Sequence, residues 1–204
     1  MRASEAARLG LENAQTKSRQ SILSDMRLVA RAYWKLWKNI LRNDPLIFIH
    51  QMGKVGSSTI IETLRASGVN PDTVYHTHFL TPAGIRYWKE HAIEGLGGRQ
   101  NFPPQLRRHL ITSRIMGKRL NQRFLSRHRC RVITLVRDPV ARNVSAFFNE
   151  YRRWPASLRE HYVGNPATHL TELRKLFLET YPQDLPLTWF DMDLKPVFGI
   201  DVYA

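Results

Sequence analysis

Two short apolar segments do most to limit the folds open to this chain. They are Leu46–His50 (LIFIH) and Arg131–Val136 (RVITLV). Runs of this length suit strands that are covered on both faces, as in a parallel sheet with helices on either side. A segment with helical signals follows each of them, so the alternation of strand and helix predicts an α/β fold with a parallel sheet.

The remaining elements are predicted from the same kind of signal. Proline in a first helical turn, a hydroxyl or carboxyl residue before it, and glycine after the last turn mark the helix ends. Helices are expected over residues 57–66, 82–95, 103–126, 139–152 and 171–179. Further strands are expected at residues 73–78 and 197–203.

A basic amphipathic helix is predicted at residues 21–41, before the first strand. Apolar side chains fall on one face of it, at Ile22, Met26, Val29, Tyr33, Trp37 and Ile40. Basic side chains fall on the intervening face, at Arg27, Arg31, Lys35, Lys38 and Arg42. We expect this helix to pack on the main domain or on a dimer partner, with peripheral contact to a membrane surface as the alternative.

The predicted division is therefore an N-terminal basic helical segment at residues 1–44 and an α/β domain at residues 45–204. The excess of basic residues follows this division only in part. The chain has 31 Lys and Arg against 17 Asp and Glu, a net charge of +14, and this excess lies mainly in residues 1–44 and 99–131. Such a balance favours an anionic partner, for example a nucleotide, an anionic glycan, nucleic acid or lipid headgroups.

The second basic block, residues 99–131, contains no acidic residue and only two aromatic ones, Phe102 and Phe124. We expect it to flank a cofactor, to receive a negatively charged glycan, or to form a solvated helix face. The stacking surface of a single-strand nucleic-acid binder is missing, so nucleic acid is not expected as a partner.

Cysteine content and hydropathy limit the expected location. The single cysteine, Cys130, excludes an intrachain disulfide and a cysteine-rich zinc site. No run reaches the roughly 20 apolar residues that a spanning helix needs, and the first 20 residues are too polar for a secretory signal. We expect a cytoplasmic protein that is soluble or lies on a membrane surface.

The loop after the first strand, residues 51–59 (QMGKVGSST), has the parts of an anion cradle. Glycines let the backbone turn its N–H groups inward, a helix N-terminus adds partial positive charge, and serine hydroxyls donate further hydrogen bonds. Lys54 precedes Gly56, whereas the nucleotide-triphosphatase loop places its lysine after the last glycine. A phosphate site is predicted here, with a plain strand-to-helix turn and a solvated lysine as the alternative.

A second anion site is predicted after the strand at residues 131–136. Arg137 ends that strand, and Ser145 lies two turns into the helix that Asp138 caps and Pro139 begins. Both side chains can face one anion. The alternative is an arginine that only pairs with Asp138 at the start of the helix.

Together the two segments resemble the sulfotransferases that use 3′-phosphoadenosine 5′-phosphosulfate (PAPS). Lysine, one residue, glycine and two hydroxyl residues after a first strand are similar to the 5′-phosphosulfate loop of that family. Residues 137–148 (RDPVARNVSAFF) are similar to the 3′-phosphate-binding segment of carbohydrate and capsular-polysaccharide-type sulfotransferases. The resemblance covers about residues 45–150 and implies a P-loop-like sheet. It departs from the cytosolic branch at Val55, where a serine is common, and at Thr59, where a tryptophan stacks on adenine.

The resemblance also implies a role for each matching residue. Lys54 would meet the phosphosulfate, the hydroxyls and N–H groups that follow it would hold the 5′-phosphate, and the arginine and serine of the second segment would grip the 3′-phosphate. The residues expected to bind the cofactor are Gly53, Lys54, Gly56, Ser57, Ser58, Thr59, Arg137 and Ser145. The product would be adenosine 3′,5′-bisphosphate, and no metal is expected.

A base is needed to take the proton of the acceptor hydroxyl, and Lys54 would stabilise the departing phosphate oxygen. His76 and His78 share one face of the strand at residues 73–78 and end near the binding edge of the sheet. His78 is preferred because it lies nearer the strand end. A core histidine and a His-x-His metal pair are the alternatives, and His50 is a weaker candidate base.

The expected function is transfer of a sulfuryl group from PAPS to a hydroxyl, with a carbohydrate, neutral or anionic, as acceptor. One alternative is a P-loop kinase or nucleotidase, which needs a magnesium carboxylate for which Asp138 is the best-placed candidate. Another is a non-catalytic nucleotide or polyanion binder. A third cofactor-contacting basic loop, usual in the family, is not recognised in residues 151–204, so the domain is expected to be minimal or incomplete at its C-terminal end.

Overall fold

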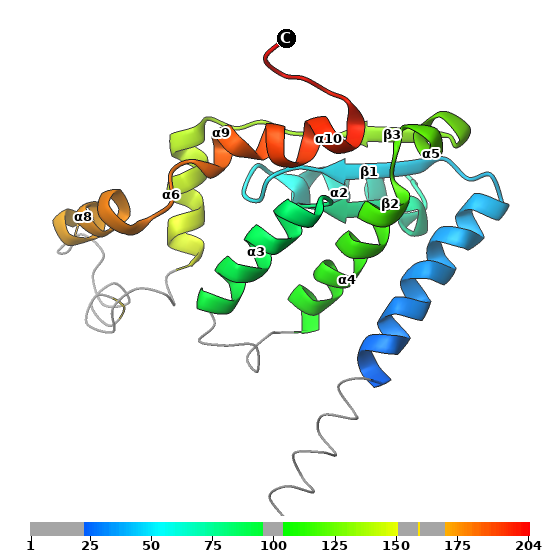
Figure 1. Cartoon of the computed structure of the whole chain (residues 1–204), viewed down its shortest axis with the longest axis horizontal. Helices are drawn as coiled ribbons and strands as arrows, with labels where there is room; N and C mark the ends of the chain where they lie inside the picture. The colour runs from blue at the N-terminus through cyan, green and yellow to red at the C-terminus, as the bar shows by residue number, and fades with distance from the viewer. Residues whose placement is uncertain (1–22, 96–103, 151–158, 160–169) are drawn as a thin grey trace, which may run out of the picture.

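The computed structural model describes residues 23–95, 104–150, 159 and 170–204. Three parallel strands lie at its centre, in the order β2-β1-β3. They are β1 (Leu46–His50), β2 (Val74–Thr77) and β3 (Cys130–Ile133) (Figure 1). Phe48 on β1 lies opposite Tyr75 on β2 and Val132 on β3. The predicted α/β fold with a parallel sheet flanked by helices is confirmed.

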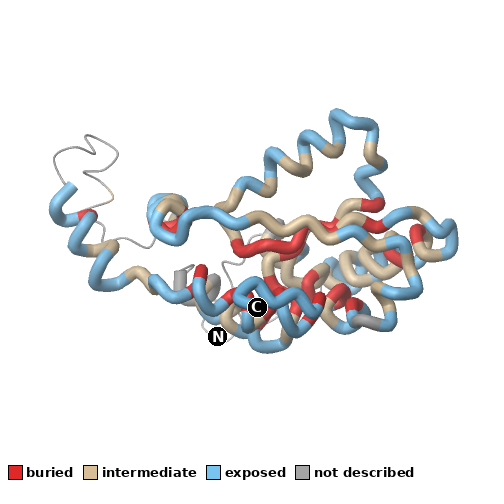
Figure 2. The backbone as a smooth tube through the Cα atoms, turned by 90° about the horizontal axis from the view of Figure 1, so that it is seen from above, coloured by how far each residue is buried: buried red, intermediate tan, exposed pale blue. Residues whose placement is uncertain are grey.

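β1 is the central strand, which explains its apolar run. Leu46, Phe48 and Ile49 are buried, because neighbouring strands cover its edges and helices cover its faces. β1 has the predicted bounds, whereas β2 and β3 are shorter than predicted. Figure 2 shows buried positions gathered in the interior of the molecule, with exposed segments at its rim.

Helices connect and cover the strands. They are α2 (Ser57–Ala66), α3 (Pro82–Gly95), α4 (Pro104–Arg119), α5 (Gln122–Arg127), α6 (Pro139–Asn149) and α8 (Leu170–Thr180). The predicted caps form as expected. Thr81 Oγ1 accepts from Gly84 N at 3.0 Å before α3, and Asp138 Oδ1 accepts from Ala141 N at 2.8 Å before α6.

The single helix predicted at residues 103–126 is wrong, because the helix is interrupted between α4 and α5. Leu120 is buried at the break, and Asn121 caps the new helix by accepting from Phe124 N at 2.8 Å. An asparagine side chain competes for backbone N–H groups in this way, which favours a new helix start over continuation.

The strand predicted at residues 197–203 is also wrong. The chain is helical from α9 (Leu185–Trp189) through a π-helical segment (Phe190–Leu194) to α10 (Lys195–Phe198). The apolar residues of this region recur at helical spacing and enter the core at Trp189, Leu194, Val197 and Phe198. Gly199, with φ of 70°, then ends the helix.

Residues 23–41 form a helix that lies against the domain. Leu36 is part of the core, and Asn39 donates from Nδ2 to Asp72 O at 2.6 Å and to Tyr75 Oη at 3.0 Å. Met26 and Trp37, which were predicted to share the helix's single apolar face, are exposed. The buried face is therefore rotated from the predicted one. Within the described residues, no helix combines the length and apolar character needed to cross a bilayer.

Candidate functional site

The loop that leaves β1 turns sharply before α2. Lys54 and Gly56 both have left-handed backbone conformations, with φ of 71° and 101°. Glycine adopts this region at little cost, so Gly56 suits the turn, whereas Lys54 is held there by its surroundings. α2 then begins at Ser57 without a side-chain cap, which leaves its first N–H groups for an anion.

The two predicted anion sites are neighbours in the structure. β1 lies between β2 and β3, so the loops after β1 and β3 leave the same edge of the sheet side by side. Arg137, after β3, donates from Nη1 to Lys54 O at 3.2 Å. Ser57 and Ser145, one from each segment, are both half-buried.

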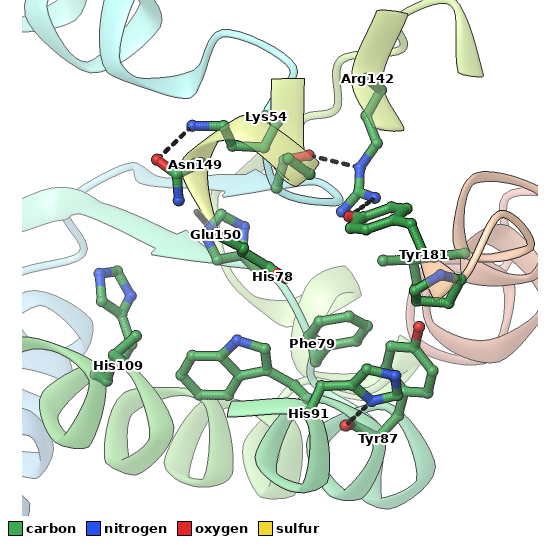
Figure 3. A pocket seen from close by; sticks show the side chains of 16 residues that line it. Lys54, His78, Phe79, Tyr87, His91, His109, Arg142, Asn149, Glu150 and Tyr181 are labelled. Carbon is green, nitrogen blue, oxygen red and sulfur yellow. Dashed lines mark hydrogen bonds between the residues drawn. The ribbon is translucent and has the colours of Figure 1, made fainter. Parts of the chain in front are cut away.

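α6 also fixes the loop from its own side. Arg142 donates from Nε to Gly53 O at 3.1 Å, and Lys54 donates from Nζ to Asn149 Oδ1 at 2.9 Å (Figure 3). Arg142 is buried and also reaches Tyr181 Oη at 3.4 Å. Arg142 is therefore not a solvated surface residue, and its contacts join the loop to residue 181.

A cavity of about 260 Å³ lies beneath this loop. Lys54 and His78 line it together, so the structure brings the predicted lysine and one predicted histidine to a single space (Figure 3). Four aromatic side chains form much of the remaining wall: Phe79, Tyr87, Trp88 and Tyr181. The pocket thus combines apolar surfaces with a few polar groups, as is typical of small-molecule sites.

His78 is held in one tautomer. Its Nδ1 lies 3.0 Å from Gln51 O, and because a carbonyl can only accept, Nδ1 carries the hydrogen. Nε2 therefore keeps its lone pair. Burial, as the main cause, and the neighbouring His76, as the next one, lower the pKa of His78 to about 3, so the ring is neutral near pH 7. Trp189 donates from Nε1 to His78 O at 2.8 Å and fixes the backbone here.

His76 does not share the cavity with Lys54. Its ring centre is 4.6 Å from that of His78, but it lines a second cavity of about 250 Å³, between β2, α4 and the helix over residues 23–41. Burial lowers its pKa to about 4, and Nε2 is enclosed without a hydrogen-bond partner.

His109 on α4 completes a group of three rings, with centres 5.6 Å from His76 and 6.0 Å from His78. It lines both cavities. The sequence reasoning missed His109, which lies within the second basic block, residues 99–131. The described residues contain no group of three or more His, Cys, Asp or Glu side chains arranged to hold a metal ion.

His50, the weaker candidate base, lies outside the cavity. It is fully buried, with Nδ1 3.0 Å from Thr77 Oγ1 and Nε2 3.2 Å from Asp193 Oδ1. Its ring centre lies 5.0 Å from that of Trp189. His50 therefore joins the sheet to the C-terminal helices.

Sequence reasoning also missed further residues of the cavity, its aromatic wall included. Asn149, Glu150 and Tyr181 line it, the first two at the end of α6 and the third before α9. Their signal in the sequence is weak, because each reaches the cavity only once α6 packs beside the loop after β1. Asp138, the candidate magnesium carboxylate, is exposed and caps α6.

Comparison with protein families, with curated protein sequences and with solved structures found no match to this chain. The functional argument therefore rests on the site itself.

Proposed function

We propose that this protein transfers a sulfuryl group from PAPS to a hydroxyl group of a carbohydrate. One observation carries the proposal. The loop with Lys54, the segment with Arg137 and the strand end with His78 meet at one edge of the sheet. Lys54 and His78 line the same cavity, and Arg137 holds the loop that contains Lys54.

The donor fits the residues around the first loop. The uncapped start of α2 and the hydroxyls of Ser57 and Ser58 suit a 5′-phosphate, and Arg137 with Ser145 suits a 3′-phosphate. PAPS supplies the sulfuryl group and a phosphate leaving group. Val136, next to Arg137, is exposed and offers an apolar surface for the adenine ring. Thr59 cannot stack on adenine as the tryptophan of the cytosolic branch does.

His78 is the proposed general base. Its Nε2 lone pair can accept the proton of a hydroxyl. The hydrogen bond from Nδ1–H to Gln51 O stabilises the ring as it gains positive charge. Negative charge brought in by a bound donor raises the pKa of a nearby histidine. His78 thus starts neutral and becomes a better proton acceptor when the site is loaded.

Lys54 is proposed to stabilise negative charge at the leaving phosphate oxygen. In the structure, Lys54 Nζ donates to Asn149 Oδ1 on α6, 2.9 Å away, and this bond holds the amine at the rim of the cavity. The aromatic walls from Tyr87, Trp88 and Tyr181 support a sugar as acceptor, because their rings cover C–H faces while their polar edges meet hydroxyls.

Calorimetry with adenosine 3′,5′-bisphosphate and with ATP, each with magnesium and with EDTA, tests the donor site. We expect tight binding of the bisphosphate that does not depend on magnesium, and much weaker binding of ATP. Preference for ATP with dependence on magnesium would instead support a kinase or nucleotidase.

Two variants test the residue roles with a radiolabelled sulfate donor and a panel of saccharides. Arg137→Ala should weaken bisphosphate binding about 10-fold or more, since hydrogen bonds to charged groups contribute about 1.5–3 kcal/mol. Lys54→Ala should mainly depress sulfate transfer. Arg65→Ala, an exposed arginine in the last turn of α2, is the control. If both variants match the parent in transfer, the site assignment is wrong. Bisphosphate binding without transfer to any saccharide would favour a non-catalytic binder.

A further inference from the structure

The helix over residues 23–41 presents a second apolar face, away from the domain. Its exposed apolar side chains are Leu23, Met26, Trp34, Trp37 and Leu41, which are between 44% and 80% exposed. At about 100° per residue, these five positions fall within about 80° of one another around the helix axis. Single exposed apolar residues are ordinary on protein surfaces, but five in one narrow sector of a helix mark an interaction surface. We call this row the outer stripe.

The outer stripe cannot turn inward, because the opposite face of the helix already holds it to the domain. Leu36 is in the core, and Asn39 and Lys35 bond to the segment around β2. Figure 1 shows the helix at the edge of the molecule, beside α4. The stripe is therefore fixed in place and open to a partner.

Basic side chains border the outer stripe on both sides. Along one side run Arg27, Arg31, Lys38 and Arg42. On the other side, Arg119 from the end of α4 lies over the rings of Tyr33 and Trp37, at 5.8 Å and 5.7 Å from their centres.

The acidic groups among the described residues offset this charge only weakly on the outer side. Asp25 faces the domain, where its Oδ1 lies 3.5 Å from Arg107 Nη1. Two pairs, Lys38 with Asp72 and Arg42 with Asp44, have N–O distances of 3.8 Å and 3.4 Å between partly exposed groups. Such exposed pairs are weak and reorganise readily in contact with another anion.

We propose that the outer stripe docks this protein on an anionic lipid surface, with the helix axis parallel to that surface. Leu23, Met26 and Leu41 enter the boundary between headgroups and acyl chains, and Trp34 and Trp37 sit at headgroup level, where indole rings concentrate. The flanking arginines and lysine meet the acidic headgroups. This docking goes beyond the proposed catalytic function and uses no residue of the catalytic cavity.

Charge argues for lipid over a second copy of the chain. Two outer stripes packed together about a twofold axis would bring Arg27 and Arg31 near the basic flank of the other copy. Within residues 23–41 the one carboxylate is Asp25, which faces the domain, so this described helix offers none to pair with them. An acidic bilayer surface supplies the missing counter-charge along the whole row.

Co-sedimentation of the full chain with vesicles tests the docking. One set of vesicles is phosphatidylcholine alone and the other contains phosphatidylserine as well. We expect the parent to bind the phosphatidylserine vesicles at least 10-fold more tightly, with affinity that falls as salt rises. The double variant Trp34→Gln, Leu41→Gln should lose at least 10-fold of that binding. Leu178→Gln, Leu187→Gln, with matched exposed leucines on α8 and α9, should bind as the parent does.

A second variant, Arg27→Gln, Arg31→Gln, separates charge from apolar insertion and should remove the preference for phosphatidylserine. Circular dichroism establishes that each variant is folded. Equal sedimentation of the parent and the Trp34, Leu41 variant would overturn the proposal. So would a lipid-independent dimer, seen by analytical ultracentrifugation, that only the Trp34, Leu41 variant loses. Neither result depends on nucleotide binding or sulfate transfer, so the docking can fail while the proposed function holds.

Discussion

Replacing His78 with asparagine should make the protein less sensitive to acid. The unfolded chain has an ordinary histidine with a pKa of 6.5, whereas burial lowers the pKa of the folded one to about 3. Between these values the unfolded state binds the extra proton, so stability is lost as pH falls below 6.5. Between pH 7.5 and pH 5 this single site should cost about 2 kcal/mol, at 1.36 kcal/mol per pH unit. Asparagine can still donate to Gln51 O but does not titrate.

The measurement is urea unfolding at pH 7.5 and at pH 5, followed by tryptophan fluorescence and circular dichroism. The loss of unfolding free energy between the two pH values should be about 2 kcal/mol smaller in His78→Asn than in the parent. His128→Gln controls for removal of one imidazole, since His128 packs on Phe124 away from the three-histidine group. An equal loss in His78→Asn and the parent would refute the buried, neutral ring described above.

Two further predictions concern packing and reactivity. Gly117→Ala should destabilise the fold by about 1–3 kcal/mol in urea unfolding, because the added Cβ would collide with the backbone carbonyl of Leu80. Gly53→Ala, with open space around it, is the control. Equal stability of the two variants would contradict the close approach of α4 to Leu80. Burial raises the pKa of Cys130 from 9.0 to about 11, so iodoacetamide at pH 7.5 should alkylate it about 100-fold more slowly in the folded chain than in the chain unfolded by urea. Mass spectrometry of this single cysteine measures the rate, and equal rates would show that the thiol is accessible in the fold.

Local signals were enough to predict the centre of the fold. β1, the loop after it and α2 were found from an apolar run followed by glycines, and the starts of α3 and α6 from a cap and a proline. Each of these signals acts between residues close in sequence. The neighbouring positions of the two anion loops followed from one further rule, that parallel strands end at a common edge.

Contacts between distant segments could not be predicted in the same way. The pairing of Lys54 with Asn149 and the bond from Arg142 to Gly53 join residues far apart in the chain. For the helix over residues 23–41, the sequence has apolar residues on two faces, so periodicity alone did not tell Leu36, which packs inward, from Trp37, which does not.

Prolines hide the C-terminal helices from sequence reasoning, because proline inside a helical pattern usually ends the helix. Pro186 and Pro196 lie in the first turns of α9 and α10, where the absent N–H group has no helical partner to lose. A π-helical segment joins the two helices, and that irregularity has no clear pattern in the sequence.

The left-handed backbone at Lys54 has a consequence for any effort to make this protein more heat-resistant. A side chain in that conformation costs about 1–2 kcal/mol relative to glycine. Screening for thermal tolerance alone would therefore reward glycine at this position and discard the amine at the rim of the cavity. Durability and chemistry draw the choice of residue 54 in opposite directions, so a stabilised version should be sought elsewhere in the chain.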